Sequence, residues 1–143
     1  MITTLIESIS IALHQEFKEK EYEIHMEEIK QDLKEPCFFI MCLNPTHKLV
    51  LGKRYFRKNQ FVIQYFPESK QNKKRECHSV AERMTWCLEH LSVIGETIPI
   101  RGTKMHYEIV DDVLQFFVNY DCFIYKVESK ETMETMESNV ILE

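Results

Sequence analysis

The sequence predicts an α+β domain: an antiparallel or mixed sheet with two amphipathic helices packed on one face. Apolar residues recur at helical spacing in residues 3–18 and again in residues 74–91. Between and after these two segments lie stretches that have the alternation or the apolar content of strands. The resulting order of helix, strands, helix and strands favours two helices on the same side of one sheet.

The predicted N-terminal helix, residues 3–18, has an apolar stripe that suits packing on a sheet. Thr3 or Thr4 is the expected N-cap, and Glu7 is the expected capping-box partner of Thr4. The stripe consists of Ile2, Leu5, Ile6, Ile9, Leu13 and Phe17. After the helix, residues 22–26 alternate between apolar and charged side chains, which predicts a half-buried edge strand.

The apolar run CFFIMCL, residues 37–43, is predicted to be a central strand. Both alternate sets of positions in this run are apolar, as expected for a strand covered on both faces. Asn44 and Pro45 are expected to form a turn after it.

The next strand is predicted at residues 55–66, with Phe61, Ile63 and Tyr65 on one face. The connection before it, residues 46–54, contains Gly52 and is expected to form the tip of a long projecting hairpin. Such a tip leaves the side chains of Leu49, Val50 and Leu51 exposed, which an isolated monomer does not favour.

The second helix is predicted from about Lys74 to Leu91, after a polar loop at residues 68–75. Trp86 lies off the centre of its apolar stripe. The expected buried residues are Cys77, Val80, Ala81, Met84, Leu88 and Leu91.

Residues 101–127 are expected to contain a β-hairpin that turns at Asp111 and Asp112, since aspartate tolerates the left-handed backbone of a tight turn. This register places Lys104 opposite Asn119 on the wetter face. It places six apolar side chains on the other face, as the pairs Ile109–Leu114, Tyr107–Phe116 and Met105–Val118.

The chain is expected to form one domain over residues 1–127, followed by an acidic C-terminal tail, residues 128–143. The tail has five acids and one lysine, and it is expected to be flexible or docked on a neighbouring subunit. The net charge of −5 argues against wide contact with nucleic acid or anionic membranes. No apolar run reaches the length of about 20 residues that spans a bilayer, and the N-terminus lacks the basic leader of a signal peptide.

The residues that could support catalysis or metal binding have plain structural interpretations. The cysteines and histidines of residues 77–90 share one helix and cannot close around one ion. Cys37 and Cys42 are expected on opposite sides of a strand, and all five cysteines are expected to be free thiols in a reducing cytoplasm. With three glycines the chain has no Gly-rich phosphate loop. The sequence therefore indicates no enzyme, no cofactor and no metal.

The residues expected to contact partners are apolar or basic side chains without a place in the core. The apolar ones suit a subunit interface, and the basic ones suit either a charged partner or a solvated face. These residues are Leu49, Val50, Leu51, Lys53, Arg54, Arg57, Lys58, Val140, Ile141 and Leu142.

Most of residues 34–126 resembles the phage tail terminator family of Gram-positive prophages and tailocins. The resemblance is carried, in order, by EPCFFI, LGKRYFR, QYFP, ECHSVAERM and RGTKMHYEIVDDVLQFFVNYDCFIY. It implies a non-enzymatic subunit that assembles as a hexameric ring on the head-proximal end of the tail tube. That ring would stop the growth of the tube, and of the sheath in a contractile tail, and would provide the docking surface for the head connector.

The partners that the resemblance implies are copies of the chain, the tail tube protein, the tail sheath protein and the neck proteins, with no membrane and no specific nucleic acid. The implied location is the virion or tailocin tail, with assembly in the host cytoplasm. Three other interpretations stay open at this point: a neck or head-completion connector protein, a small ligand-binding regulatory domain with an enclosed pocket, and a Cys-His enzyme.

Overall fold

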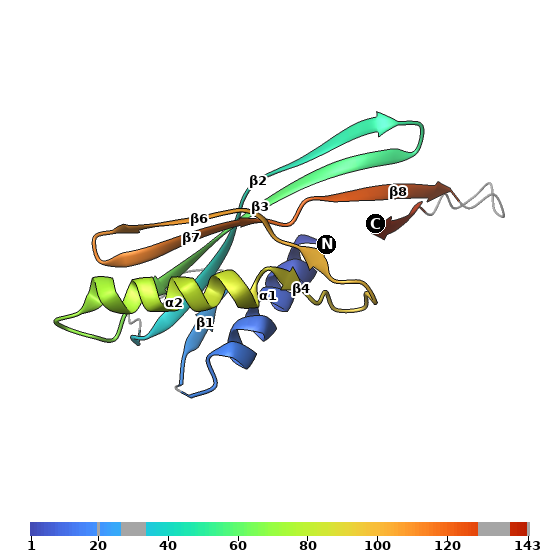
Figure 1. Ribbon diagram of the computed structural model, residues 1–143. Coiled ribbons are helices and arrows are strands. Elements are labelled where there is room, and N and C mark those ends of the chain that lie inside the picture. The colour runs from blue at the N-terminus through green and yellow to red at the C-terminus, as the bar shows by residue number, and fades with distance from the viewer. Residues whose placement is uncertain (20, 27–33, 129–137, 143) are drawn as a thin grey trace.

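The computed structural model describes residues 1–19, 21–26, 34–128 and 138–142, with the backbone alone at residues 127–128 and 138–142. It confirms an α+β fold with two helices, α1 (Ile2–Glu16) and α2 (Lys73–Cys87), on one side of a mixed sheet (Figure 1). Neither helix of the described chain is long and apolar enough to cross a membrane.

The main sheet has seven strands, with the spatial order β1-β2-β3-β7-β6; in addition, β8 pairs with β3, and β9 pairs with β8. All its pairs are antiparallel except the parallel pair β1–β2. The bounds are β1 Glu23–His25, β2 Cys37–Leu51, β3 Arg54–Phe66, β6 Thr103–Val110, β7 Val113–Asn119, β8 Cys122–Glu128 and β9 Ser138–Leu142. A separate pair joins β4 (His90–Leu91) to β5 (Ile100–Arg101).

The core lies between the helices and the sheet. Of the predicted stripe of α1, Leu5, Ile9, Leu13 and Phe17 are buried there, and Ile2 and Ile6 are partly buried against them. The expected face of β3 is confirmed, with Phe61, Ile63 and Tyr65 at most 1% exposed. The α2 stripe is confirmed as well, since all six of its predicted residues are buried. The β7 residues that complete this core are Leu114, Phe116 and Val118.

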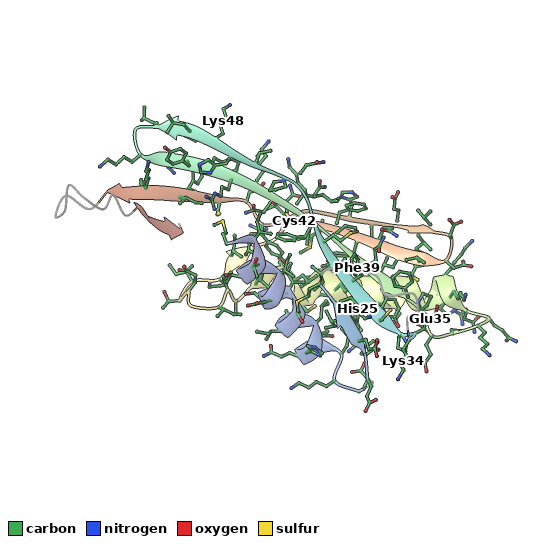
Figure 2. The ribbon with its side chains drawn as sticks, turned by 180° about the vertical axis from the view of Figure 1, so that it is seen from behind. His25, Lys34, Glu35, Phe39, Cys42 and Lys48 are labelled. Carbon is green, nitrogen blue, oxygen red and sulfur yellow. The ribbon has the colours of Figure 1, made fainter. Side chains whose placement is uncertain are left out.

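In β2, the start of the predicted run is central and buried on both faces, from Cys37 to Ile40, whereas residues 41–43 are half-buried; β1 lies at the edge beside it. Figure 2 shows the molecule from behind the view of Figure 1, with His25 of β1 and Phe39 of β2 labelled. Phe39 is only 3% exposed although it faces away from the helices.

The predicted turn at Asn44 and Pro45 is wrong, because β2 continues through both residues to Leu51. The pairing with β3 shifts by one residue between Leu43 and Thr46, and Asn44 has a φ of 43°. The two residues therefore form a β-bulge, which bends the strand without ending it.

The β6–β7 hairpin turns at Asp111 and Asp112 as predicted, and both residues have positive φ, at 52° and 61°. The predicted pairs Ile109–Leu114 and Tyr107–Phe116 are confirmed. Farther from the turn the predicted register is wrong: Thr103 lies opposite Asn119 in place of Lys104, and Met105 has no direct partner. A β-bulge with Lys104 at a φ of 51° absorbs the extra residue.

Both helix boundaries differ from the predictions. The N-cap of α1 is Met1, without a side-chain cap, so the predicted Thr3 or Thr4 cap is wrong. Because the helix starts at Ile2, the carbonyl of Thr4 is already inside it and accepts a hydrogen bond from Ser8 Oγ at 2.7 Å. At the other end, α2 stops at Cys87, since the Leu88 carbonyl accepts the hydroxyl of buried Tyr120 at 2.6 Å and Leu91 pairs in β4.

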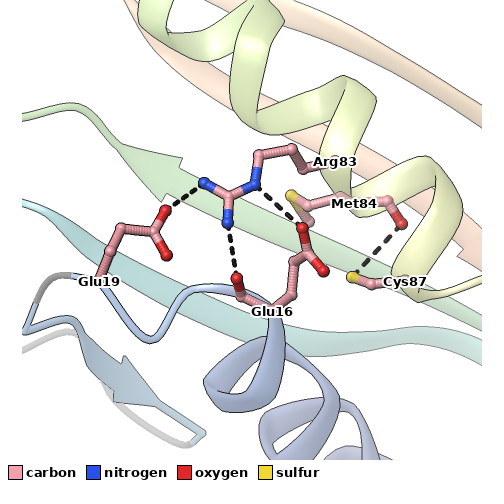
Figure 3. A network of polar contacts seen from close by, with 5 residues as sticks. All are labelled: Glu16, Glu19, Arg83, Met84 and Cys87. Carbon is pink, nitrogen blue, oxygen red and sulfur yellow. Dashed lines mark hydrogen bonds and ion pairs between the residues drawn. The ribbon is translucent and has the colours of Figure 1, made fainter.

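Arg83 joins the two helices (Figure 3). Its Nε donates to Glu16 Oε1 at 3.0 Å, its Nη2 donates to the Glu16 carbonyl at 2.6 Å, and its Nη1 bonds the carboxylate of Glu19. The guanidinium also lies 4.3 Å above the ring of Phe17. These two carboxylates raise the pKa of Arg83 further above its usual value, and the cation stabilises the carbonyl end of α1.

Candidate interaction surfaces

The hairpin of β2 and β3 extends beyond the helices as an arm (Figure 1). We define the arm as residues 44–58 together with residues 122–126 of β8. Residues 122–125 pair with β3 from Arg54 to Arg57, and the Lys126 N–H donates to the Lys53 carbonyl. The arm thus begins where β3 leaves β7, its partner from Gln60 to Tyr65, and takes β8 in its place.

Asn59 occupies the point where β3 changes partner, and it is 1% exposed. Its Nδ2 donates to the Tyr120 carbonyl at 3.0 Å, and its backbone N–H donates to Asp121 Oδ1, also at 3.0 Å. Its own carbonyl accepts the Tyr120 N–H at 2.8 Å. A buried polar side chain is stable only when its hydrogen bonds are made, so Asn59 holds the start of β8 in one position relative to β3.

The tip of the arm is apolar and exposed, as the sequence predicts. Leu49, Val50 and Leu51 are 54%, 51% and 79% exposed, and Gly52 completes the turn with a φ of 58°. Lys48, whose end projects outward in Figure 2, and Lys53 flank the three apolar residues. The tip therefore presents aliphatic side chains beside positive charge.

The four predicted basic residues of the arm fall into two groups. Lys53 and Lys58 are exposed. Arg54 and Arg57 are half-buried: Arg54 lies 4.1 Å above the ring of Phe123, and Arg57 donates to Nδ1 of His47 at 2.9 Å. The arginines thus stabilise the arm itself, and the lysines remain available to a partner.

A groove of about 210 Å³ lies beside the base of the arm, on the side of the helices. Its walls come from the start of α1, from the connector of residues 93–100 and from β8. The Ile94 N–H donates to Ser8 Oγ at 3.1 Å, which ties the connector to α1. The lining residues are Met1, Leu5, Val93, Glu96, Thr97, Ile98, Pro99, Ile100 and Cys122.

The groove is smaller than the usual site for a drug-sized molecule, which has about 300–1,000 Å³. Ile98 on its rim is 79% exposed. The single carboxylate in its lining belongs to Glu96. Aliphatic side chains accompanied by positive charge therefore suit this groove best.

The five cysteines are free thiols, and three of them, Cys37, Cys77 and Cys122, are buried. Burial raises the pKa of each of these three thiols to about 11 and that of Cys87 to about 12. Such thiols are protonated at neutral pH, which is the opposite of an activated nucleophile. Within the described parts of the chain, no group of three or more His, Cys, Asp or Glu side chains is placed to hold a metal ion.

A larger hollow, of about 820 Å³, lies by the start of β1 and β2, and its lining includes four glutamates. Its other lining residues are His14, Tyr22, Lys34 and Pro36, so its surface mixes charges of both signs with apolar groups. It does not have the mostly apolar, enclosed character of a small-molecule site.

The C-terminal residues Val140, Ile141 and Leu142 belong to β9, whose backbone pairs antiparallel with β8. Ile141 lies opposite Tyr125, for example. The side chains of these three residues lie outside the described part of the structure, as do residues 129–137 and 143. Their predicted contact with a partner is not tested by this pairing.

The sequence predicted the exposed apolar tip and named Lys53 and Lys58 as candidate contact residues. It did not predict the buried role of Asn59 or the groove. The sequence signal for Asn59 is a polar residue on the face that carries Phe61, Ile63 and Tyr65. The groove has no local signal, because its walls come from three separate segments.

A sequence model of the family described as phage tail terminator protein matches residues 4–132. No curated protein matches the chain.

Proposed function

Because the chain belongs to the phage tail terminator protein family, a family of structural tail proteins, we propose that it caps the head-proximal end of the tail tube. Copies of the chain form a ring there, and the ring ends the growth of the tube, and of the sheath where the tail is contractile. Its outer face then receives the head connector. The chain acts by contact and not by catalysis.

The observation that carries this proposal is the arm, with three exposed aliphatic residues at its tip. An exposed apolar tip on a rigid hairpin is costly for a monomer and is typical of a surface that a partner buries. The buried contacts of Asn59 and the stacking of Arg54 on Phe123 hold the arm in shape before any partner binds. A preorganised arm loses less conformational freedom on binding.

The contact residues proposed for partner subunits, tube or sheath are the tip residues Leu49, Val50 and Leu51 and the exposed Lys53 and Lys58. Arg54 and Arg57 contribute by shaping the arm. The segment of residues 128–143, with Val140, Ile141 and Leu142, contributes a second contact region. This assignment follows the surplus of apolar and charged groups in these segments.

Electron microscopy of tails assembled without the protein tests the cap. We expect tails of uncontrolled length, and normal length on adding back the wild-type chain. Tails of uniform length in the absence of the protein would refute the proposal. Mass measurement of the purified chain in solution shows whether the ring forms before it meets the tail.

Two variants test the contact regions separately. The double charge reversal Lys53→Glu with Lys58→Glu is expected to weaken capping, because it reverses two of the exposed positive charges of the arm. Lys104→Glu, in the bulge of the β6–β7 hairpin, is the matched control, since it reverses an exposed lysine outside the arm. Deletion of residues 128–143 that leaves both ring formation and capping intact would remove the C-terminal region from the scheme.

A further inference from the structure

We propose that the arm tip of one copy docks into the groove beside α1 of a second copy of this chain. This contact deepens the proposed function, since it rests on self-assembly and names the surfaces that meet. The occupant is residues 49–51, and the receptor is the hollow between Met1, Leu5 and the connector of residues 93–100.

The two surfaces match in apolar character. Leu51 at the tip and Ile98 on the groove rim are both 79% exposed, which leaves two separate apolar regions on one chain in contact with solvent. The groove volume of about 210 Å³ suits aliphatic side chains better than a drug-sized ligand. Inserting the tip into the groove covers both regions at once.

The two surfaces also match in charge. Residues 44–60 contain Lys48, Lys53, Arg54, Arg57 and Lys58 and no acidic residue. The residues that line the groove include Glu96 and no lysine or arginine, while Arg57 of the same chain reaches Met1 Sδ at 3.2 Å. Glu96 lines the groove itself, where Lys48 or Lys53 of an inserted tip can reach it. Opposed charges of this kind fix the orientation of a contact.

The pairing of unlike surfaces on one chain explains why the partner is a second copy. The tip and the groove lie at different places on the same molecule, so they make a head-to-tail contact that repeats from copy to copy. Such a contact closes into a ring when the rotation between copies allows it. The groove also has firm walls, since Ser8 ties the connector to α1.

Two single variants and one matched control test the contact by sedimentation of the full chain. Leu51→Asp and Ile98→Asp are each expected to raise the dissociation constant of self-association at least about 30-fold, as for an interface hot spot. Val110→Asp is the control, because Val110 is an exposed apolar residue, 47% exposed, on the tip of the other hairpin. All three positions are open to solvent, so at a dilution where the wild-type chain is monomeric the thermal melting of each variant is expected to match that of the wild-type chain.

Photo-crosslinking from the tip identifies the receptor directly. Val50 is replaced by p-benzoylphenylalanine, and the labelled chain is mixed with isotopically heavy wild-type chain so that cross-links between copies are recognised by mass. Cross-links are expected in residues 1–5 and 93–100 of the other copy. Cross-links elsewhere, or a wild-type chain that stays monomeric at every concentration, would overturn the contact.

The outcomes separate this contact from the cap itself. Self-association unchanged by Leu51→Asp and Ile98→Asp overturns the tip-in-groove contact and leaves capping intact. Tails of uniform length without the protein overturn capping whatever the variants do. Loss of self-association in both single variants, with the control unchanged, supports the contact.

Discussion

Replacing Asn59 by alanine is expected to destabilise the chain by about 2 kcal/mol. The substitution removes the hydrogen bond from Nδ2 to the Tyr120 carbonyl, which is 3.0 Å long and buried. A buried acceptor that loses its donor costs about 1–3 kcal/mol, and the middle of that range applies because the backbone bonds of Asn59 remain. For a chain of this size, 2 kcal/mol corresponds to a fall in Tm of about 4–8 °C.

The assay is urea unfolding followed by circular dichroism, carried out in the Leu51→Asp background. This background keeps self-association from adding to the measured free energy of unfolding, since binding between copies stabilises the folded state. Gln60→Ala is the matched control: it removes a neighbouring amide from the half-exposed face of β3 and is expected to change stability by less than about 0.5 kcal/mol.

If Asn59→Ala lowers the free energy of unfolding no more than Gln60→Ala does, Asn59 does not hold β8 against β3 at the base of the arm. Hydrogen exchange gives a second readout. The amides of β8 are expected to exchange faster in Asn59→Ala than in the wild-type chain, while those of β7 change little, because Asn59 holds the start of β8.

Three further predictions concern the framework that positions the arm and the groove. Gly102→Ala is expected to lower the free energy of unfolding by about 1–3 kcal/mol, because an added Cβ would lie 2.8 Å from the Leu88 carbonyl oxygen. An unchanged Tm in thermal melting would contradict this crowding. Arg83→Ala is expected to cost about 1–2 kcal/mol by removing the bonds from α2 to α1, and the exposed Arg75→Ala on the same helix serves as its control in the same urea titration. The free energy of unfolding is expected to fall as pH rises from 9 toward 11, since the Cys77 thiol has a pKa of about 11 when folded and about 9.0 when unfolded. The protonated thiol contributes its full stabilisation below pH 9, and by about pH 10 the free energy of unfolding has fallen by about 1 kcal/mol. An equal dependence of stability on pH in Cys77→Ala would show that this thiol contributes nothing to it.

The fold class and the buried stripes could be predicted from the sequence because they depend on local periodicity. Apolar spacing at 3.6 residues identified the buried face of α2, and alternation identified the face of β3 that carries Phe61 and Ile63. The turn at Asp111 and Asp112 was equally local, since two aspartates in succession can both adopt positive φ. The exposed tip of residues 49–51 followed from its position in a long hairpin.

The predictions that failed concern the ends and irregularities of elements, where a distant segment competes with the local signal. Asn44 and Pro45 have the residues of a turn, yet pairing with β3 on both sides carries the strand through them as a bulge. The second helix has an apolar pattern up to Leu91, yet Tyr120 takes the Leu88 carbonyl and β5 takes the backbone of Leu91.

The sequence by itself determined the class of fold, the two helical stripes, the exposed tip and the family resemblance that residues 34–126 carry. Only the tertiary structure decided that β3 exchanges β7 for β8 at Asn59, that Arg54 and Arg57 are engaged while Lys53 and Lys58 are exposed, and that a groove lies beside α1. The physical reason is the range of the interactions. Periodicity and turn conformation are properties of neighbouring residues, whereas the groove and the arm depend on contacts between segments that are far apart in the chain.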